Sequence, residues 1–160
     1  MSITELAPAK LNLTLDVGAR RPDGYHEITS VMQSAALYDV VTLETVETDD
    51  IVVECPGTDL PTGPDNLAWK AADVFFQETN IPRTGIFIRL EKKIPFQAAL
   101  GGGSSDAAAV LRGMRRLFSA NVSDEALETM AARVGSDVPY CVRGGTALAR
   151  GRGERLTALS

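Results

Sequence analysis

Residues 100–106 read Leu-Gly-Gly-Gly-Ser-Ser-Asp and lead directly into a segment with apolar residues at helical spacing. Glycine lets a ligand approach the backbone closely and permits positive φ angles. A helix that begins here would point its unpaired N–H groups and the positive end of its dipole at one spot. Because phosphate commonly binds at such a helix end, the stretch predicts an anion cradle. The structural alternative is a tight strand-to-helix connection capped by Ser104 or Ser105.

The loop matches neither of two familiar nucleotide-binding motifs. The sequence contains no Gly-x-x-x-x-Gly-Lys-Ser/Thr and no Gly-x-Gly-x-x-Gly. The hydroxyl of either serine could still reach a nucleotide-bound Mg²⁺, which prefers one or two protein oxygens together with phosphates. The motifs contain no evident acidic metal ligand, so we name no metal-binding residue.

Length and composition predict one folded domain over residues 1–160, since 44% of residues are hydrophobic and 23% charged. The net charge of −5 argues against nucleic acid as a partner, because surfaces that follow a phosphate backbone are basic. No apolar run reaches membrane-spanning length and no signal-peptide pattern is present. Cys55 and Cys141 are interpreted as buried free thiols. We therefore expect a cytoplasmic protein without a nucleic-acid or membrane partner.

Acidic residues dominate one part of the chain, where no Lys or Arg interrupts them. We interpret this run as a solvated face of strands and loops, far from any phosphate. Its members are Asp39, Glu44, Glu47, Asp49, Asp50, Glu54, Asp59 and Asp65.

Strict alternation predicts a half-buried strand over residues 10–17, with an apolar side formed by Leu11, Leu13, Leu15 and Val17. A turn should follow at residues 21–24. Further strands are expected at residues 28–36, 40–46, 51–54, 86–90 and 145–150, with a hairpin joining residues 40–46 to residues 51–54.

Three helices are expected from apolar residues at helical spacing. The first covers about residues 66–79 and is capped by Asp65. The second follows the glycines, and its core positions are Ala107, Val110, Leu111, Met114, Leu117 and Phe118. The third covers residues 123–134. Because the strands are concentrated early in the chain, the pattern favours an α+β fold.

Two separate positions carry groups suited to phosphoryl transfer. Lys10 lies on the polar face of the first strand, where a lysine ordinarily borders solvent. Asp137 follows Gly-Ser and precedes Val-Pro, where an aspartate ordinarily caps a helix or stabilises a turn. Near each other, the carboxylate would accept a hydroxyl proton and the ammonium would stabilise the charge.

The pair Tyr25-His26 follows the turn at residues 21–24. An aromatic ring beside the only histidine of the chain could stack on a planar base and read its edge. A structural hydrogen bond from the histidine is the alternative, and the residues alone do not rank the two.

The chain resembles the 4-diphosphocytidyl-2-C-methyl-D-erythritol kinases, a branch of the GHMP kinase superfamily. The similarity runs in order from about residue 6 to residue 159, and the segment at residues 21–27 is specific to the cytidyl branch. Four motifs carry it: residues 8–12 (Pro-Ala-Lys-Leu-Asn), 21–27 (Arg-Pro-Asp-Gly-Tyr-His-Glu), 100–108 (Leu-Gly-Gly-Gly-Ser-Ser-Asp-Ala-Ala) and 135–139 (Gly-Ser-Asp-Val-Pro).

The resemblance implies Mg²⁺- and ATP-dependent phosphorylation of the 2-hydroxyl of a cytidyl diphosphate substrate, a step of non-mevalonate isoprenoid synthesis. It makes Asp137 the base and Lys10 its electrostatic partner. It also implies that Tyr25 and His26 hold cytosine and that Asn12 contacts the erythritol part. The nucleotide would be held by Asn66, near the adenine, and by Pro95, Phe96, Gln97, Ala98, Ala99, Leu100, Gly101, Gly102, Gly103, Ser104 and Ser105.

The family's N-terminal domain has a ribosomal-protein-like fold with a left-handed βαβ crossover, against the usual right-handed rule. Family members continue into a C-terminal α/β domain that forms the far wall of the cleft, and this domain is missing from the 160 residues. Ala99 stands where the family has a glycine, so a positive φ there would strain the loop.

Three hypotheses follow. The chain is an active kinase completed by a homodimer partner or by a complementing C-terminal chain. Alternatively it is a catalytically incompetent nucleotide- or cytidyl-binding domain. The third hypothesis is a fragment that associates through an apolar surface which the second domain would cover.

Overall fold

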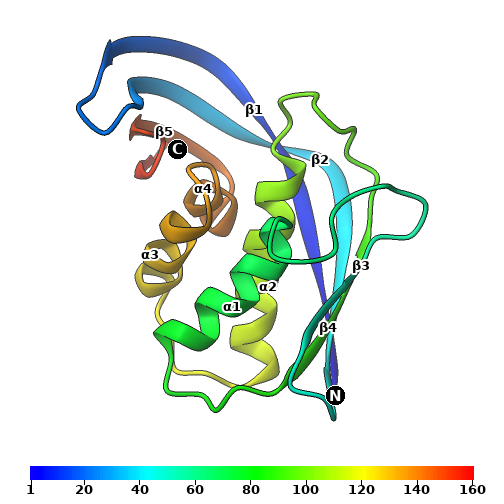
Figure 1. Ribbon diagram of the computed structural model, residues 1–160. Helices are drawn as coiled ribbons and strands as arrows, with labels where there is room; N and C mark the ends of the chain where they lie inside the picture. The colour runs from blue at the N-terminus through cyan, green and yellow to red at the C-terminus, as the bar shows by residue number, and fades with distance from the viewer.

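The computed structural model describes residues 1–160 and is organised around the long strand β2 (His26–Val46) (Figure 1). β1 (Ser2–Arg20) pairs antiparallel with β2 along nearly its whole length. The other edge of β2 is shared: β4 (Gly85–Glu91) pairs with its C-terminal end and β5 (Thr146–Gly151) with its N-terminal part. Residues 34–39 of β2 therefore have no strand on that edge.

Two short strands complete the six-stranded sheet. β3 (Ile51–Glu54) pairs parallel with β4 and is joined to it through helix α1 (Leu67–Glu78). β6 (Arg155–Ala158) pairs antiparallel with β5. The predicted hairpin between residues 40–46 and 51–54 is thus wrong. The apolar strand β4 takes the central place between β2 and β3, where its inward side chains are fully buried: Ile86, Ile88 and Leu90.

The α+β expectation is confirmed, and the unit β3–α1–β4 is a parallel βαβ unit. The left-handed sense of its crossover stays a prediction. Helices α2 (Gly102–Leu117), α3 (Asp124–Val134) and α4 (Val138–Arg143) pack with α1 in a layer on the sheet (Figure 1). None of these helices has the length and apolar content that crossing a membrane would require.

The predicted core positions of α2 are confirmed except at Phe118, which is the C-cap of the helix and only half-buried. In α2, Ala107, Val110, Leu111 and Met114 are fully buried. The caps differ from the expectation. Asn66, not Asp65, is the N-cap of α1, because its side-chain oxygen accepts from the backbone N–H of Ala68 at 2.9 Å.

The apolar side predicted for residues 10–17 is not buried. The irregularity between Asn12 and Thr14 adds one residue to β1, so that Leu11 faces Gln33 and Leu15 faces Ser30. Because side chains alternate along β2, Leu11 and Leu15 point to opposite faces of the sheet. Both are exposed, as are the other two apolar residues of the run. The reason is that residues 11–31, the end of the β1–β2 pair around its connecting turn and here called the β1–β2 arm, extend past the helices (Figure 1).

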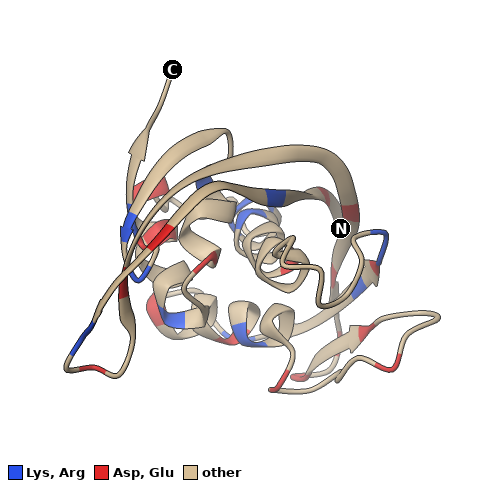
Figure 2. Ribbon diagram, turned by 90° about the horizontal axis from the view of Figure 1, so that it is seen from above, with Lys and Arg blue, Asp and Glu red and all other residues tan.

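The acidic run is mostly exposed, but its first member is not. Asp39 is 0% exposed and receives three hydrogen bonds from residues 92–94. The interpretation of the whole run as a solvated face is therefore wrong at Asp39. Elsewhere charges are dispersed, with Lys and Arg interleaved with Asp and Glu rather than gathered on one basic face (Figure 2).

Both cysteines are buried and unpaired, as expected. Burial raises the pKa of the Cys141 thiol to about 12. Since the thiolate is the reactive form, we expect Cys141 to resist iodoacetamide in the native protein at pH 8 and to react fully in urea. Mass spectrometry of the alkylated peptides measures this difference, and rapid native labelling of Cys141 would contradict the burial.

Candidate functional site

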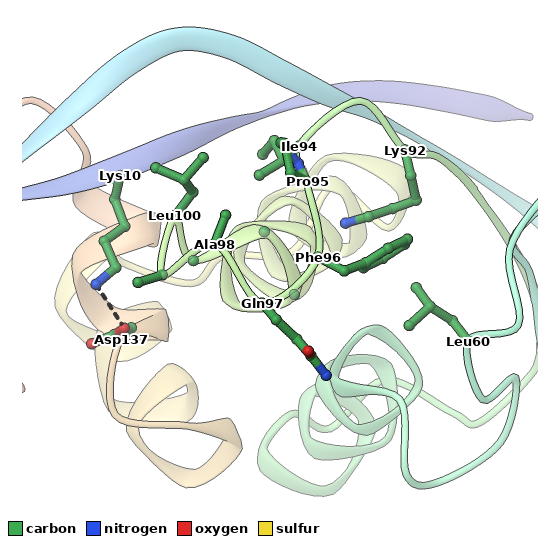
Figure 3. A pocket seen from close by; sticks show the side chains of 14 residues that line it. Lys10, Leu60, Lys92, Ile94, Pro95, Phe96, Gln97, Ala98, Leu100 and Asp137 are labelled. Atoms are coloured by element: carbon green, nitrogen blue, oxygen red, sulfur yellow. Dashed lines mark ion pairs between the residues drawn. The ribbon is translucent and has the colours of Figure 1, made fainter.

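A cavity of about 400 Å³ lies at the N-terminal end of α2 (Figure 3). Its wall is the segment between β4 and α2, together with a lysine from β1 and the residue that precedes α4. Nine of the residues predicted to hold nucleotide line it: Pro95, Phe96, Gln97, Ala98, Ala99, Leu100, Gly101, Gly102 and Gly103. Lys10 and Asp137 line it as well, so the structure brings the predicted pair to the predicted loop.

The glycine loop, which we define as residues 92–101, holds an uncommon backbone conformation. Gln97 and Ala99 have φ angles of 55° and 57° although neither is glycine. A left-handed conformation costs an L-residue about 1–2 kcal/mol, so surrounding contacts must hold the loop in place. One such contact is the backbone N–H of Lys10, which donates to the carbonyl of Leu100 at 2.9 Å.

The N-terminus of α2 is open. Its N-cap is Gly101, with a φ of 67°, and no side chain caps the helix. The first backbone bond of the helix runs from the N–H of Ser105 to the carbonyl of Gly101. The amides of Gly102, Gly103 and Ser104 therefore have no intrahelical acceptor, and with the helix dipole they suit an anion.

Lys10 and Asp137 form an ion pair, with 3.2 Å between Nζ and Oδ2 (Figure 3). The lysine side chain is 7% exposed and the aspartate side chain 33% exposed, so Lys10 is buried while a ligand can reach the carboxylate of Asp137. Asp137 occupies the N-cap position of α4 but makes no capping hydrogen bond. Its carboxylate is thus free for a ligand, contrary to the structural alternative.

Asn12 extends this pair along the sheet. Its Oδ1 accepts from Lys10 Nζ at 3.3 Å and from the hydroxyl of Ser30 at 3.4 Å. Asn12 does not line the cavity, but it lies beside the ion pair on the inner face of β1. A ligand bound at Asp137 and reaching toward the β1–β2 arm would pass Asn12.

Three residues predicted to hold nucleotide do not line the cavity, and two of them have other contacts. The hydroxyl of Ser105 donates to the carbonyl of Pro8 at 2.7 Å, and Ser105 is 0% exposed. Asn66 caps α1 and donates to the carbonyl of Pro61. Neither residue lines the cavity, and nor does Ser104.

Tyr25 and His26 lie away from the cavity, at the tip of the β1–β2 arm. Tyr25 is 50% exposed, and the guanidinium of Arg152 lies over its ring at 4.9 Å from the centroid. His26 Nδ1 is 3.1 Å from the carbonyl of Gly18. The histidine therefore makes the structural hydrogen bond, while one face of the tyrosine ring is occupied by a cation.

Sequence reasoning missed several residues of the cavity. Lys92, Ile94 and Leu60 line it, and Lys92 and Phe96 lie at the opposite end from the ion pair (Figure 3). Arg152 was missed as well. Helix α4, which begins directly after Asp137, is signalled only by Pro139, a residue suited to the first turn of a helix.

Gly101 is the position where a side chain would do most damage to the cavity. A Cβ there would lie 2.7 Å from Lys10 Cγ and would have to adopt a φ of 67°. We expect Gly101→Ala to displace Lys10 and to weaken ATP binding at least tenfold, as measured by calorimetry. Gly63→Ala is the matched control, because a Cβ at Gly63 meets nothing within 4 Å. Equal ATP affinity in both variants would contradict the prediction.

Residues 66–145, half of the chain, match the model of the GHMP kinases N terminal domain. The chain belongs to the GHMP kinase family. As a GHMP kinase, it is 46% identical to the 4-diphosphocytidyl-2-C-methyl-D-erythritol kinase of Bacillus subtilis, over all of this chain and 55% of that protein. It is 48% identical to the enzyme of the same name from Pelotomaculum thermopropionicum, over 99% of this chain and 55% of that one. This GHMP kinase chain therefore spans about half the length of the curated relatives it matches.

Solved structures of GHMP kinases have the same fold as this chain. A crystal structure of 4-(cytidine 5'-diphospho)-2C-methyl-D-erythritol kinase superposes with a TM-score of 0.81 at 42% identity, covering 99% of this chain and 55% of that one. The Methanococcus jannaschii mevalonate kinase superposes with a TM-score of 0.75 at 13% identity, over 100% and 56% of the two chains. The second likeness shows the shared fold alone.

Proposed function

We propose that this chain is the N-terminal, nucleotide-binding half of a kinase that phosphorylates the 2-hydroxyl of 4-diphosphocytidyl-2-C-methyl-D-erythritol. The observation that carries the proposal is the Lys10–Asp137 pair beside the open N-terminus of α2. A base, a cation and an anion cradle at one cavity suit transfer of a phosphoryl group to an alcohol. The similarity to kinases of that name supports the choice of substrate.

In this proposal ATP supplies the phosphoryl group and Mg²⁺ neutralises charge on its phosphates. The residues fit a nucleotide, since the amides of Gly102 and Gly103 are free and a Cβ at Gly102 would already be tight, 3.2 Å from Ile94 Cγ2. No group of three His, Cys, Asp or Glu residues forms a metal site. Mg²⁺ in nucleotide sites keeps few protein ligands, so it would be held here chiefly by the phosphate oxygens of ATP.

The roles of the chain's own residues follow from their positions. Asp137 accepts the proton of the substrate hydroxyl on its exposed side. Lys10 stabilises the resulting charge and holds the carboxylate in place. Asn12 orients the substrate next to Lys10, and Tyr25 offers its free ring face to cytosine. The cytosine ring would bind at the β1–β2 arm while the substrate hydroxyl reaches Asp137, so the substrate would lie along β1.

Turnover of ATP that depends on the cytidyl substrate tests the proposal. The assay is run on the chain alone and on the chain joined to the remaining part of the Bacillus subtilis relative, because this chain spans only half of such kinases. Turnover in either form supports the kinase. ATP binding without turnover in both forms would favour the incompetent binding domain instead. Absence of both binding and turnover would overturn the proposal, and light scattering at several concentrations would then test self-association.

A further inference from the structure

The glycine loop needs support at the end that faces β4. Most of its residues are exposed, and two of them hold left-handed backbone conformations without being glycine. The bond from Lys10 to Leu100 fixes only the end next to α2. Contacts at residues 92–94 must fix the other.

Asp39 provides those contacts from the unpaired edge of β2. Its Oδ1 accepts from the backbone N–H groups of Lys93 and Ile94, the latter at 2.8 Å. Its Oδ2 accepts from Lys92 Nζ at 2.5 Å. A carboxylate with 0% exposure and three donors fixes both the backbone and the side chain at the start of the loop.

Lys92 carries the connection to α2. The same Nζ donates to Asp106 Oδ2 at 2.5 Å, and Asp106, in the first turns of α2, is 1% exposed. Lys92 is the first residue of the glycine loop, so its ion pair with Asp106 joins the start of the loop to the helix that follows the loop. The buried ion pair therefore closes the segment from residue 92 to residue 106 into a ring, and eleven of the fourteen residues that line the cavity belong to that segment.

Lys92 is a poor candidate for a phosphate ligand, although it lines the cavity. Its side chain is 5% exposed and lies between two carboxylates, which already neutralise its charge. Burial lowers the pKa of the Lys92 ammonium, but the carboxylates of Asp106 and Asp39 raise it above its usual value overall. The ammonium therefore stays charged and committed to its two partners.

We propose that Asp39, Lys92 and Asp106 form a positioning triad that holds the glycine loop in its nucleotide-binding shape. The proposal rests on the proposed function for the identity of the nucleotide. None of the three residues touches the reacting atoms. They act through the backbone of residues 93–101, and their loss would leave the loop free to relax its left-handed residues.

Asp39→Asn tests the triad, because it preserves shape while turning a donor toward Lys92. We expect the Kd for ATP to rise at least tenfold, measured by calorimetry at a temperature where circular dichroism shows the variant folded. Hydrogen exchange of the free protein should accelerate at residues 93–101, while protection in α1 and α3 stays unchanged. Asp106→Asn keeps an oxygen for Lys92 and should give a smaller effect of the same kind, which also serves if Asp39→Asn does not fold.

Asp73→Asn is the matched control, since it breaks a surface ion pair with Arg83 away from the loop. It should change neither ATP affinity nor loop exchange. A triad with only a structural role would lower stability and leave both readouts of the folded variants unchanged, and that result would overturn the proposal. If the unmodified chain binds no ATP, the proposed function fails instead, while the exchange comparison still decides whether the triad holds the loop.

Discussion

Replacing Asp137 with asparagine should slow substrate-dependent phosphoryl transfer by about 10³-fold, within the range that loss of a general base usually causes. The amide keeps the size of the side chain but cannot accept the hydroxyl proton. The ion pair with Lys10, 3.2 Å long, is lost at the same time. ATP binding should change less than about threefold, because the free amides of α2 remain. Rapid-quench kinetics with saturating ATP separate the chemical step from binding.

Asp124→Asn is a suitable control for this experiment. Asp124 also forms an ion pair at the start of a helix, but its side chain is 77% exposed and lies away from the cavity. It should retain the full rate. An Asp137→Asn variant that also retains the full rate would exclude this carboxylate as the base, even if ATP and substrate bind normally.

Lys92→Met should lower the free energy of unfolding by about 3–5 kcal/mol, the usual cost of stranding a buried charge. The substitution leaves the carboxylates of Asp39 and Asp106 side by side without their cation. Oδ1 of Asp106 already lacks a hydrogen-bond partner, so without Lys92 no donor would offset the cost of burying this carboxylate. Urea unfolding followed by the fluorescence of Trp69 measures the loss.

The loss should depend on pH in a known direction. Burial raises the pKa of Asp106 to about 7, against the opposing effect of Lys92. Without the lysine the folded state binds protons more tightly than the unfolded state, so stability is recovered as the pH falls. The deficit should be larger at pH 8 than at pH 5. The nearby thiols of Cys55 and Cys141 have raised pKa values and stay protonated over this range.

The double variant Lys92→Met with Asp106→Asn provides the check. It removes one stranded charge and leaves Asp39 with its two backbone donors. It should recover part of the stability and lose most of the pH dependence. A deficit of equal size in both variants would mean that lost packing around Lys92, rather than charge, accounts for the effect.

Local patterns predicted much of the fold and the centre of the site. The periodicity of residues 107–117 located α2, and the three glycines located the open helix end that the structure contains. Lys10 and Asp137 were predicted as partners from the resemblance, and they are in contact. Residues close in sequence, or carried by a motif, could be placed because their environment is determined nearby along the chain.

Long-range pairing could not be predicted in the same way. Asp39 belongs to a stretch without basic residues and gave no local sign of burial, yet its partners come from residues 92–94. The extra residue near Leu13 reverses the faces of β1 without changing the alternation of the sequence. The parallel pairing of β3 with β4 depends on a helix crossing between them. Each of these is decided by contacts across the sheet.

The shared edge of β2 has a consequence for synthesis of the chain. About 100 residues separate the end of β2 from the start of β5, which a ribosome adds in roughly 5–20 s. During that time β1 and β2 can form their antiparallel pair, but the edge that β5 will occupy stays open to other strands. The β1–β2 arm therefore emerges as a two-stranded ribbon with one unpaired edge. Chaperone binding and aggregation during translation should concentrate at that edge.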